Sequence, residues 1–204
     1  NVKSFTTTAT DYTIAEMTNN GTFIVGDGTN AADVTVTNLK EGTGTYEVKS
    51  SATMKAANAV LTEMKKGTTN VSGTLQISDN VEIAAADIVA TGEAGKLGLA
   101  STGTLEAPKV TLTGTALHAS GTIKTAALVL DKDATVEARA GTLTVAGETA
   151  SISGAEMLTL GAGVLNIGTE DTASTVESTS AITVSGGTLT VAYGSTLKMS
   201  AALN

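Results

Sequence analysis

The chain has 204 residues, of which 41% are hydrophobic and only 2% aromatic, and it carries a net charge of −8 with no Cys. The lack of Cys excludes a disulfide scaffold and thiol chemistry. The acidic balance, with Arg139 as the only arginine, argues against nucleic-acid binding because few cations are present to neutralise phosphates.

Residues 1–72 carry strand-like phrases in a less regular arrangement, and we expect them to form irregular N-terminal turns or a separate head or cap. Residues 52–66 fit either two strands or one short helix, because their apolar residues follow helical spacing. The phrases that resemble strands are 5–9, 12–15, 21–25, 33–37 and 45–49.

Residues 73–204 alternate between apolar and polar side chains in short runs, which is typical of β-strands with one buried face. The predicted strands are 73–78, 81–85, 87–91, 96–100, 103–107, 109–113, 116–119, 121–125, 127–130, 135–139, 141–146, 150–154, 157–161, 163–168, 174–178, 181–185, 187–191 and 195–200. Taken in threes, they make turns of about 20 residues, each with three short strands.

A short phrase that begins with Gly returns once in each of these turns. It starts at Gly103, Gly121, Gly141, Gly163 and Gly187, so that the intervals are 18, 20, 22 and 24 residues. A repeat of this length built from β-formers predicts a right-handed parallel β-solenoid, or β-helix, of about nine turns. The recurring Gly fits a corner at which positive φ is often needed.

The alternation also predicts which side chains face the core, because successive residues of a strand point to opposite sides. We expect outward-facing threonines at positions 142 and 144. The inward-facing residues of three repeats are expected to stack on one internal face, and they are Leu143, Val145, Leu165, Ile167, Leu189 and Val191.

No set of residues predicts catalysis, and we expect no cofactor and no catalytic residue. His118, the only histidine, follows Leu117 and should point outward as an ordinary strand residue. Glu170 and Asp171 are adjacent in a corner loop, and we expect no aromatic sugar platform near them, so a solvated loop is expected rather than a glycosidase pair.

The loop 26–33 is a weak calcium candidate because Asp27, Asn30 and Asp33 carry the oxygen ligands that calcium favours. Its spacing matches neither an EF-hand nor the calcium-binding solenoid repeat. A solvated turn is the expected alternative, since Asp, Asn and Gly all favour turns.

Outward Thr-x-Thr pairs at 142/144, 188/190 and 111/113 form an array like that on solenoid ice-binding proteins. The equivalent positions of other turns hold Glu106, Lys124 and Asn166. Charged side chains interrupt an ice-like lattice, so an ordinary Thr-rich strand surface is expected.

The phrases at 141–146, 185–191 and 194–200 resemble the repeats of autotransporter adhesin passenger domains, and the resemblance covers roughly residues 73–200. Similar repeats occur in phage fibres and in surface-layer proteins. The resemblance implies an extracellular or cell-surface location and a role in adhesion or in building a surface structure. A location on a virion is the alternative.

The functional expectation is therefore a non-enzymatic structural or adhesive solenoid, with a viral fibre or a self-assembling surface-layer or filament subunit as alternatives. A host or cell-surface glycan or protein is the expected partner.

The sequence contains no run of 18 apolar residues, so no membrane span is expected. The chain begins with Asn1 rather than Met, and we expect a processed chain or a segment of a longer one. The last turn, 187–200, has no polar cap, so we expect the stack to continue there or to associate with another subunit.

Overall fold

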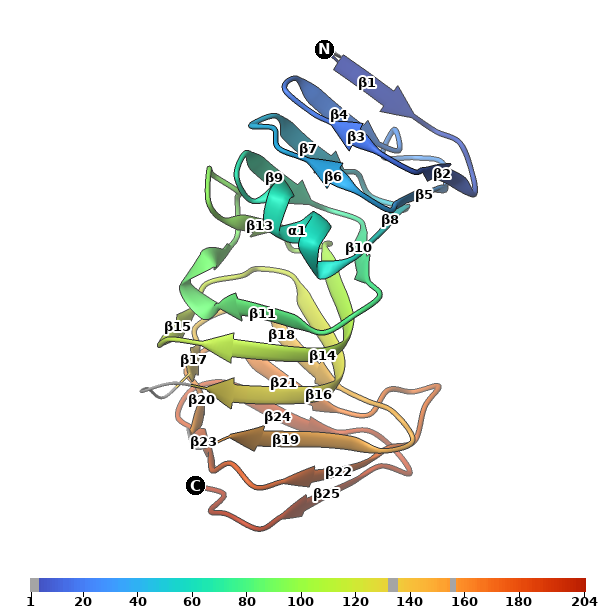
Figure 1. Ribbon diagram of the computed structural model, residues 1–204. Helices are drawn as coiled ribbons and strands as arrows, with labels where there is room; N and C mark the ends of the chain where they lie inside the picture. The colour runs from blue at the N-terminus through green and yellow to red at the C-terminus, as the bar shows by residue number, and fades with distance from the viewer. Residues whose placement is uncertain (1–3, 132–135, 155–156) are drawn as a thin grey trace.

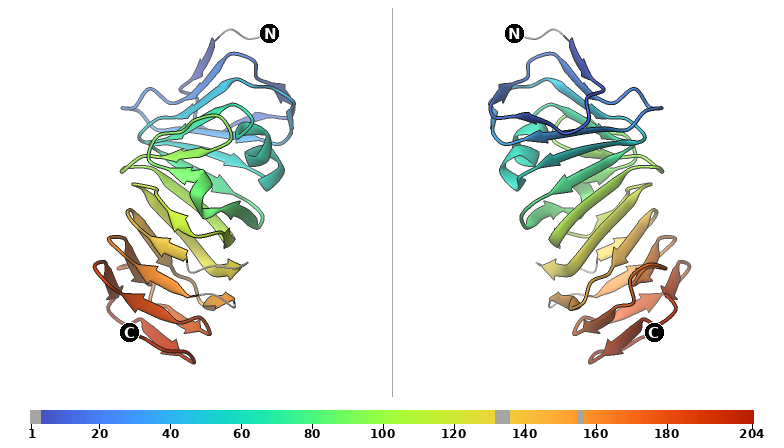
Figure 2. Two further views of the ribbon diagram at one scale, coloured as in Figure 1. Left: turned by 90° about the vertical axis from the view of Figure 1, so that its left-hand side faces the viewer. Right: turned by 90° about the vertical axis from the view of Figure 1, so that its right-hand side faces the viewer.

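The computed structural model describes residues 4–131, 136–154 and 157–204. It is a parallel β-solenoid of about nine turns with one short helix, in which each turn lies beneath the one before it (Figure 1). At about 4.8 Å between neighbouring strands, nine turns give a column of about 40 Å. The two side views in Figure 2 show this column with the N-terminus at one end and the C-terminus at the other.

The coil has three walls, which we number in the order in which the chain visits them. Wall 1 consists of a six-stranded sheet above a four-stranded one, and the two are linked by a single bridge between Val89 and His118. The strands of the upper sheet are β1 (Ser4–Thr7), β4 (Thr22–Val25), β7 (Thr45–Val48), β9 (Thr68–Val71), β13 (Leu97–Leu99) and β12 (Ile88–Val89). The strands of the lower sheet are β15 (Ala116–Leu117), β17 (Val136–Ala138), β20 (Leu158–Leu160) and β23 (Ile182–Val184).

Wall 2 is a single continuous sheet along the whole stack. The strands of the first 72 residues and those of the rest of the chain therefore belong to the same sheet. Two of its strands are long, bend halfway and continue into wall 3. The strands of wall 2 are β2 (Tyr12–Ile14), β5 (Ala32–Val36), β8 (Ala52–Ala56), β10 (Thr74–Ile77), the first halves of β14 (Thr104–Thr113) and β16 (Thr122–Asp131), β18 (Thr142–Val145), β21 (Val164–Ile167) and β24 (Thr188–Val191).

Wall 3 lies on the near side in Figure 1 and changes its structure along the stack. At the top are the two-residue strands β3 (Met17–Thr18) and β6 (Leu39–Lys40), followed by helix α1 (Asn58–Met64) and then a regular sheet. The sheet consists of β11 (Val81–Ala84), the second halves of β14 and β16, β19 (Ala150–Gly154), β22 (Thr175–Ser178) and β25 (Thr196–Met199). A 3-10 turn, η1 (Ala85–Asp87), follows β11.

In Figure 1 the near strands run to the left and the far strands of wall 2 run to the right while the chain descends, which makes the coil right-handed. The region 52–66 is neither two strands nor one helix throughout, because strand β8 forms its first part and helix α1 its second part. Helix α1 neither caps nor flanks the stack. It takes the place of a strand in wall 3, packs against β6 and directs the buried side chains of Val60, Leu61 and Met64 into the core.

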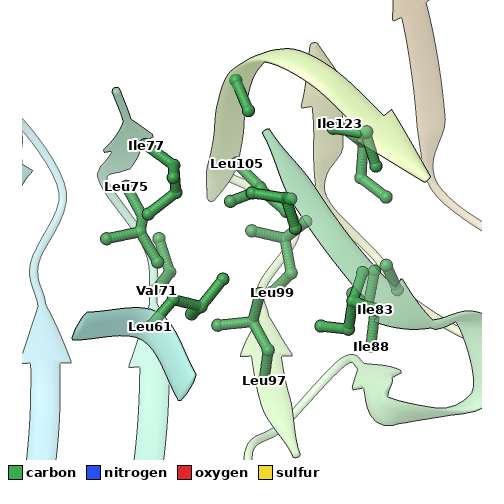
Figure 3. Close-up of a cluster of buried hydrophobic side chains, with 14 of the residues drawn as sticks. Leu61, Val71, Leu75, Ile77, Ile83, Ile88, Leu97, Leu99, Leu105 and Ile123 are labelled. Atoms are coloured by element: carbon green, nitrogen blue, oxygen red, sulfur yellow. The ribbon is translucent and has the colours of Figure 1, made fainter. Parts of the chain in front are cut away.

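The core is a single column of aliphatic side chains, in which equivalent positions of successive turns stack on one another. Along wall 2 the buried residues of consecutive strands are in register; they are Val34, Met54, Leu75, Leu105, Ile123, Leu143 and Leu165. Figure 3 shows part of this column, with Leu75, Leu105 and Ile123 from wall 2 facing Leu97 and Leu99 from wall 1. Each buried Leu or Ile contributes about 1.5–3 kcal/mol, so the column is the main source of stability.

The predicted inward set is correct in register but not in burial at its last turn. Leu143, Val145, Leu165 and Ile167 are buried, whereas Leu189 is only partly buried and Val191 is 45% exposed. The reason is position, because within the described chain β24 is the last strand of wall 2 and its inward side chains are stacked on one side only.

The recurring Gly is required by close packing of backbones rather than by positive φ. Of the five repeat glycines, only Gly141 has a positive φ, of 72°. A Cβ at Gly121 would overlap the carbonyl oxygens of Ala100 and Gly103 on the previous turn. The expectation of positive φ was therefore wrong at four of the five positions, where glycine lets one turn approach the next.

Candidate functional site

One outward column of wall 2 carries a polar side chain on every turn. Each residue is paired in register with the next, so the side chains succeed one another at the strand spacing of about 4.8 Å. The column consists of Thr13, Thr35, Lys55, Gln76, Glu106, Lys124, Thr144, Asn166 and Thr190. The predicted array at Glu106, Lys124, Thr144, Asn166 and Thr190 is confirmed by this register. Thr111 and Thr113 do not belong to it, because they lie on the second half of β14, in wall 3.

Two hollows lie one after the other along this column, at the corner between walls 2 and 3. We call them the upper and the lower hollow. The corner lies on the right in Figure 1, where β14 and β16 bend. We refer to the two hollows and the polar column that lines both of them as the groove, which follows the axis of the solenoid.

The upper hollow has a volume of about 510 Å³ and combines charged side chains with an apolar floor. Lys55, Gln76, Glu106 and Lys124 line it from wall 2, while Ile77, Ala107, Pro108 and Ala126 come from the corner. It exists because β14 and β16 turn the corner within one strand, with no loop to cover the bend.

The bend in β16 is fixed by the hydroxyl of Thr125. This hydroxyl donates to the carbonyl oxygens of Pro108 and Ala127, at 3.2 and 3.0 Å, and accepts from the Ala127 amide at 3.2 Å. The hydroxyl is thus held by the backbone of two consecutive turns.

The charges of the upper hollow are only partly compensated. Lys124 Nζ lies 3.2 Å from Glu106 Oε1, and both side chains remain partly exposed. Lys55 makes no ion pair within the part of the chain that the structure describes. Among the described residues, the hollow therefore presents the unpaired ammonium group of Lys55 beside the ion pair of Lys124 and Glu106.

The lower hollow has a volume of about 600 Å³ and lies where the corner loops are longest. Thr144, Asn166 and Thr190 of the polar column line one side, and Glu170 and Tyr193 come from the corner loops after β21 and β24. Tyr193 is fully exposed, whereas Thr144 is only 7% exposed. The expectation that Thr144 faces open solvent was wrong because its neighbours in the column and the loop after β21 enclose it.

The corner loop that contains Glu170 is held by serine side chains. The Ser174 hydroxyl accepts a hydrogen bond from the Gly147 amide at 3.0 Å and donates to the Thr172 carbonyl at 3.3 Å. The Ser174 amide donates to the Ser195 hydroxyl at 3.0 Å. Because these contacts join three consecutive corner loops, the side of the lower hollow is fixed before any ligand binds.

The structure separates the two adjacent carboxylates considered in the sequence. Glu170 lines the lower hollow, while Asp171 is not among its lining residues. The expectation that no aromatic ring lies near them was wrong, since Tyr193 lines the same hollow as Glu170. The two residues are 23 positions apart, but this distance is close to one turn of the coil, and register rather than sequence proximity brings them together.

The remaining candidates lie apart from the groove. His118 is exposed after β15, as predicted. The Asp27 carboxylate accepts hydrogen bonds from the amides of Thr29 and Asn30, both at 2.8 Å, and from the Asn30 side chain at 2.9 Å. These bonds, chiefly those from Asn30, lower the pKa of Asp27 to about 2.

The calcium candidate is thus a loop whose first carboxylate is already engaged by its own amide groups, while Asp33 lies in β5. Across residues 4–131, 136–154 and 157–204, no three His, Cys, Asp or Glu side chains come together as a metal site would require.

One polar group is buried inside the stack rather than displayed on it. Tyr46 of β7 is completely buried beside Phe23, with ring centroids 6.5 Å apart, and its hydroxyl has no hydrogen-bond partner among the described residues. Burial raises the pKa of Tyr46 to about 12. The Asn19 side chain, which lies near the hydroxyl without a regular hydrogen bond to it, opposes this rise, and the negative charge of Glu63 adds to it. Its position in the core excludes a role in contacts with a ligand.

The polar column could be predicted from the sequence only after residue 100, and the groove could not be predicted at all. Lys55, Gln76 and Thr35 were missed because the register of the first four turns could not be read from irregular repeats. Tyr193 was missed as well, although a lone tyrosine beside a glycine, in a chain with few aromatic residues, could have been noticed.

In the described residues no helix is long and apolar enough to cross a membrane. No protein-family model, no curated protein and no solved structure matches this chain.

Proposed function

We propose that this chain is a non-enzymatic structural and adhesive element that works outside the cell and contacts an extended partner along the groove. One observation carries the proposal: the polar column places a hydrogen-bonding or charged side chain on each successive turn, beside two open hollows. A linear partner that lies along the axis would meet the same kind of contact at each turn. Many weak contacts in register give avidity without a deep pocket.

A polymer rich in hydroxyl groups suits this surface best. The column offers hydroxyl, amide, ammonium and carboxylate groups, which together can both donate to and accept from hydroxyls. A β-strand partner suits it less well, because walls 2 and 3 pair their backbone groups within the stack and leave no free edge along the groove. We therefore propose a glycan at a cell surface as the partner.

The proposal is tested by adhesion of the full chain to surfaces coated with polysaccharides, such as dextran, cellulose, alginate and hyaluronan. The groove variant replaces Lys55, Gln76 and Lys124 with Ala. All three side chains point outward from wall 2, so their removal leaves the core unchanged. The matched control replaces Thr111, Glu177 and Lys198 with Ala on the outer face of wall 3. We expect retention on at least one coat that falls in the groove variant and persists in the control. No retention on any coat, or equal retention of both variants, contradicts the proposal.

A second candidate function, a subunit of a self-assembling filament or layer, is supported by the end of the column. Val184, Val191 and Leu203 of the last turn are 37%, 45% and 52% exposed, although the first two occupy core positions of their walls. Exposed apolar surface of this kind is stabilised when another subunit packs against it. The two functions are compatible, because assembly would use the end of the column and adhesion its side.

A further inference from the structure

We infer that the lower hollow is a subsite for a neutral saccharide unit, in which Tyr193 stacks on the sugar ring and Asn166, Thr190 and Glu170 bind its hydroxyl groups. The inference rests on the proposed adhesive function and assigns a ligand class to one part of the groove. Five observations, all on described residues, support it.

The first observation is the exposure of Tyr193. Phe23 and Tyr46 are buried in the core. Phe5 and Tyr12 occupy inward positions at the N-terminal end of the solenoid. Tyr193 alone among the aromatic residues stands on a corner loop, fully exposed, at the rim of a hollow. An exposed aromatic ring offers a flat apolar face with a polar tip, which is the shape that packs on the C–H face of a pyranose ring.

The second observation is the set of side chains opposite this ring. Asn166 can donate and accept, Thr190 carries a hydroxyl, and Glu170 is an acceptor that can bind two neighbouring hydroxyls of one sugar. None of these side chains makes a hydrogen bond or an ion pair to any residue that the structure describes. Their bonding capacity is therefore available to a ligand.

The third observation is the floor of the hollow. Thr144 is more than nine-tenths buried, yet it lines the hollow together with Asn166 and Thr190. Its hydroxyl has no bonding partner in the described part of the chain. The Thr144 hydroxyl is not sealed from solvent, so a ligand hydroxyl that enters the hollow can reach it and form a hydrogen bond with it.

The fourth observation is that the loop is already ordered. Thr169 and Thr172 exchange backbone hydrogen bonds at 3.1 and 3.3 Å, which closes the loop that carries Glu170. Ser174 and Ser195 fasten the same loop to its neighbours. A site that does not need to be ordered on binding keeps more of its contact energy as affinity.

The fifth observation concerns charge. Glu170 is the only charged residue that lines the lower hollow, whereas the upper hollow carries Lys55 and Lys124. An acidic sugar at the lower hollow would face the Glu170 carboxylate, and no cation is among the residues that line this hollow. The lower hollow therefore selects a neutral saccharide, and its volume of about 600 Å³ is in the range of small-molecule sites.

The test uses the full chain, labelled with ¹⁵N, titrated with neutral hexasaccharides of glucose and mannose and with an acidic hexagalacturonate. We expect amide shifts in residues 166–172 and 188–195 with a neutral probe and smaller ones with the acidic probe. Tyr193→Ala should weaken binding about tenfold, while Tyr193→Phe should retain most of it because the ring remains. The matched control is Thr175→Ala, an exposed position on wall 3. Both Tyr193 variants are expected to fold, because the side chain touches no core residue.

The outcomes separate the inference from the proposed function. If adhesion to coated surfaces is retained at full strength by Tyr193→Ala, the inference is overturned and the proposed function stands. If adhesion fails but a neutral probe shifts the lower hollow and Tyr193→Ala abolishes the shift, the inference stands and the adhesive function does not. Preferential binding of the acidic probe, or equal binding by Tyr193→Ala and the control, overturns the inference. An absence of both adhesion and saccharide shifts overturns both.

Discussion

Ile167 and Val191 occupy the same inward position on consecutive turns, yet Ile167 is fully buried and Val191 is 45% exposed. The difference arises from their neighbours along the stack. Ile167 is sandwiched between Val145 and Val191, whereas Val191 has a neighbouring turn on one side alone. Burial in a solenoid is thus set by the number of stacked neighbours as much as by the alternation within a strand.

This relationship predicts unequal costs for similar truncations. Ile167→Ala removes buried methyl groups from the middle of the column and should lower the free energy of unfolding by about 2–5 kcal/mol. Val191→Ala at the open end should cost roughly 1 kcal/mol or less, because the side chain is already half in solvent. Urea denaturation followed by circular dichroism measures both. Equal costs would show that the last turn is covered in solution.

The repeat glycines predict a second pair of unequal effects. Gly121→Ala places a methyl group against the carbonyl oxygens of the previous turn, which belong to paired backbone and cannot move aside. We expect a cost at or above about 3 kcal/mol, the upper end of the usual range for overpacking.

Gly114→Ala is the control for Gly121→Ala. Gly114 has a positive φ of 81°, but no atom lies within 4 Å of the added Cβ, so only backbone strain of about 1–2 kcal/mol is expected. A thermal melt of each variant compares the two. A larger loss of stability for Gly114→Ala would contradict the argument from backbone approach.

The regular part of the fold could be predicted because a solenoid repeats one local rule. The alternation in 103–113 and 121–130 predicted strands on two walls, and the structure joins each pair into one bent strand, β14 and β16. The upper turns were harder because β3 and β6 contain two residues each, which is too short for any periodicity. Helix α1 was ambiguous because Met54, which continues the helical spacing of the apolar residues in α1, also lies on the inward face of β8.

The groove depends on features that a strand pattern does not encode. The burial of Thr144 results from the loop after β21, whose path is set by Ser174 and Ser195. The approach of Tyr193 to Glu170 depends on two loops of different length that lie one above the other. Register predicts which residues share a column, whereas loop conformation decides what covers it.

Tyr46 predicts a specific loss of stability in alkaline solution. Its pKa is about 12 in the folded protein, above the ordinary value of 10, because burial disfavours the phenolate and the nearby Glu63 carboxylate adds to the effect. Because folding raises the pKa of Tyr46, the contribution of this residue to the free energy of unfolding is fully present below pH 10. It is lost as the pH rises from 10 to 12. The loss is on the order of 2–3 kcal/mol.

Tyr46→Phe isolates this effect. At pH 8 the variant should be as stable as the parent or more so, because it removes a buried hydroxyl that has no partner. Between pH 10 and 12 its free energy of unfolding should fall less steeply than that of the parent. Tyr193→Phe, at a fully exposed position, is the control and should follow the parent curve. Parallel curves for the parent and Tyr46→Phe would contradict the assignment.

The exposed last turn at the C-terminal end of the solenoid predicts concentration-dependent association between chains. Residues 202–204 already pair with β23, since the Ile182 amide donates to the Ala202 carbonyl at 3.0 Å and the Asn204 amide to the Ile182 carbonyl at 3.0 Å. The edges of β24 and β25 have no such cover within the described chain, and they carry apolar side chains with Lys198 as their only charge. Open edges of this kind pair readily with other strands.

Light scattering at rising protein concentration should therefore show particles larger than one chain. Leu203→Asp places a charge on the apolar end and should shift association to higher concentration, since an aspartate there must be desolvated on contact. Ser101→Asp adds the same charge at an exposed turn in the middle of the stack, away from the end, and should leave association unchanged. A parent chain that stays monomeric at every concentration would refute association through this end. An equal effect of the two substitutions would show instead that net charge, and not the open turn, controls the size of the particles.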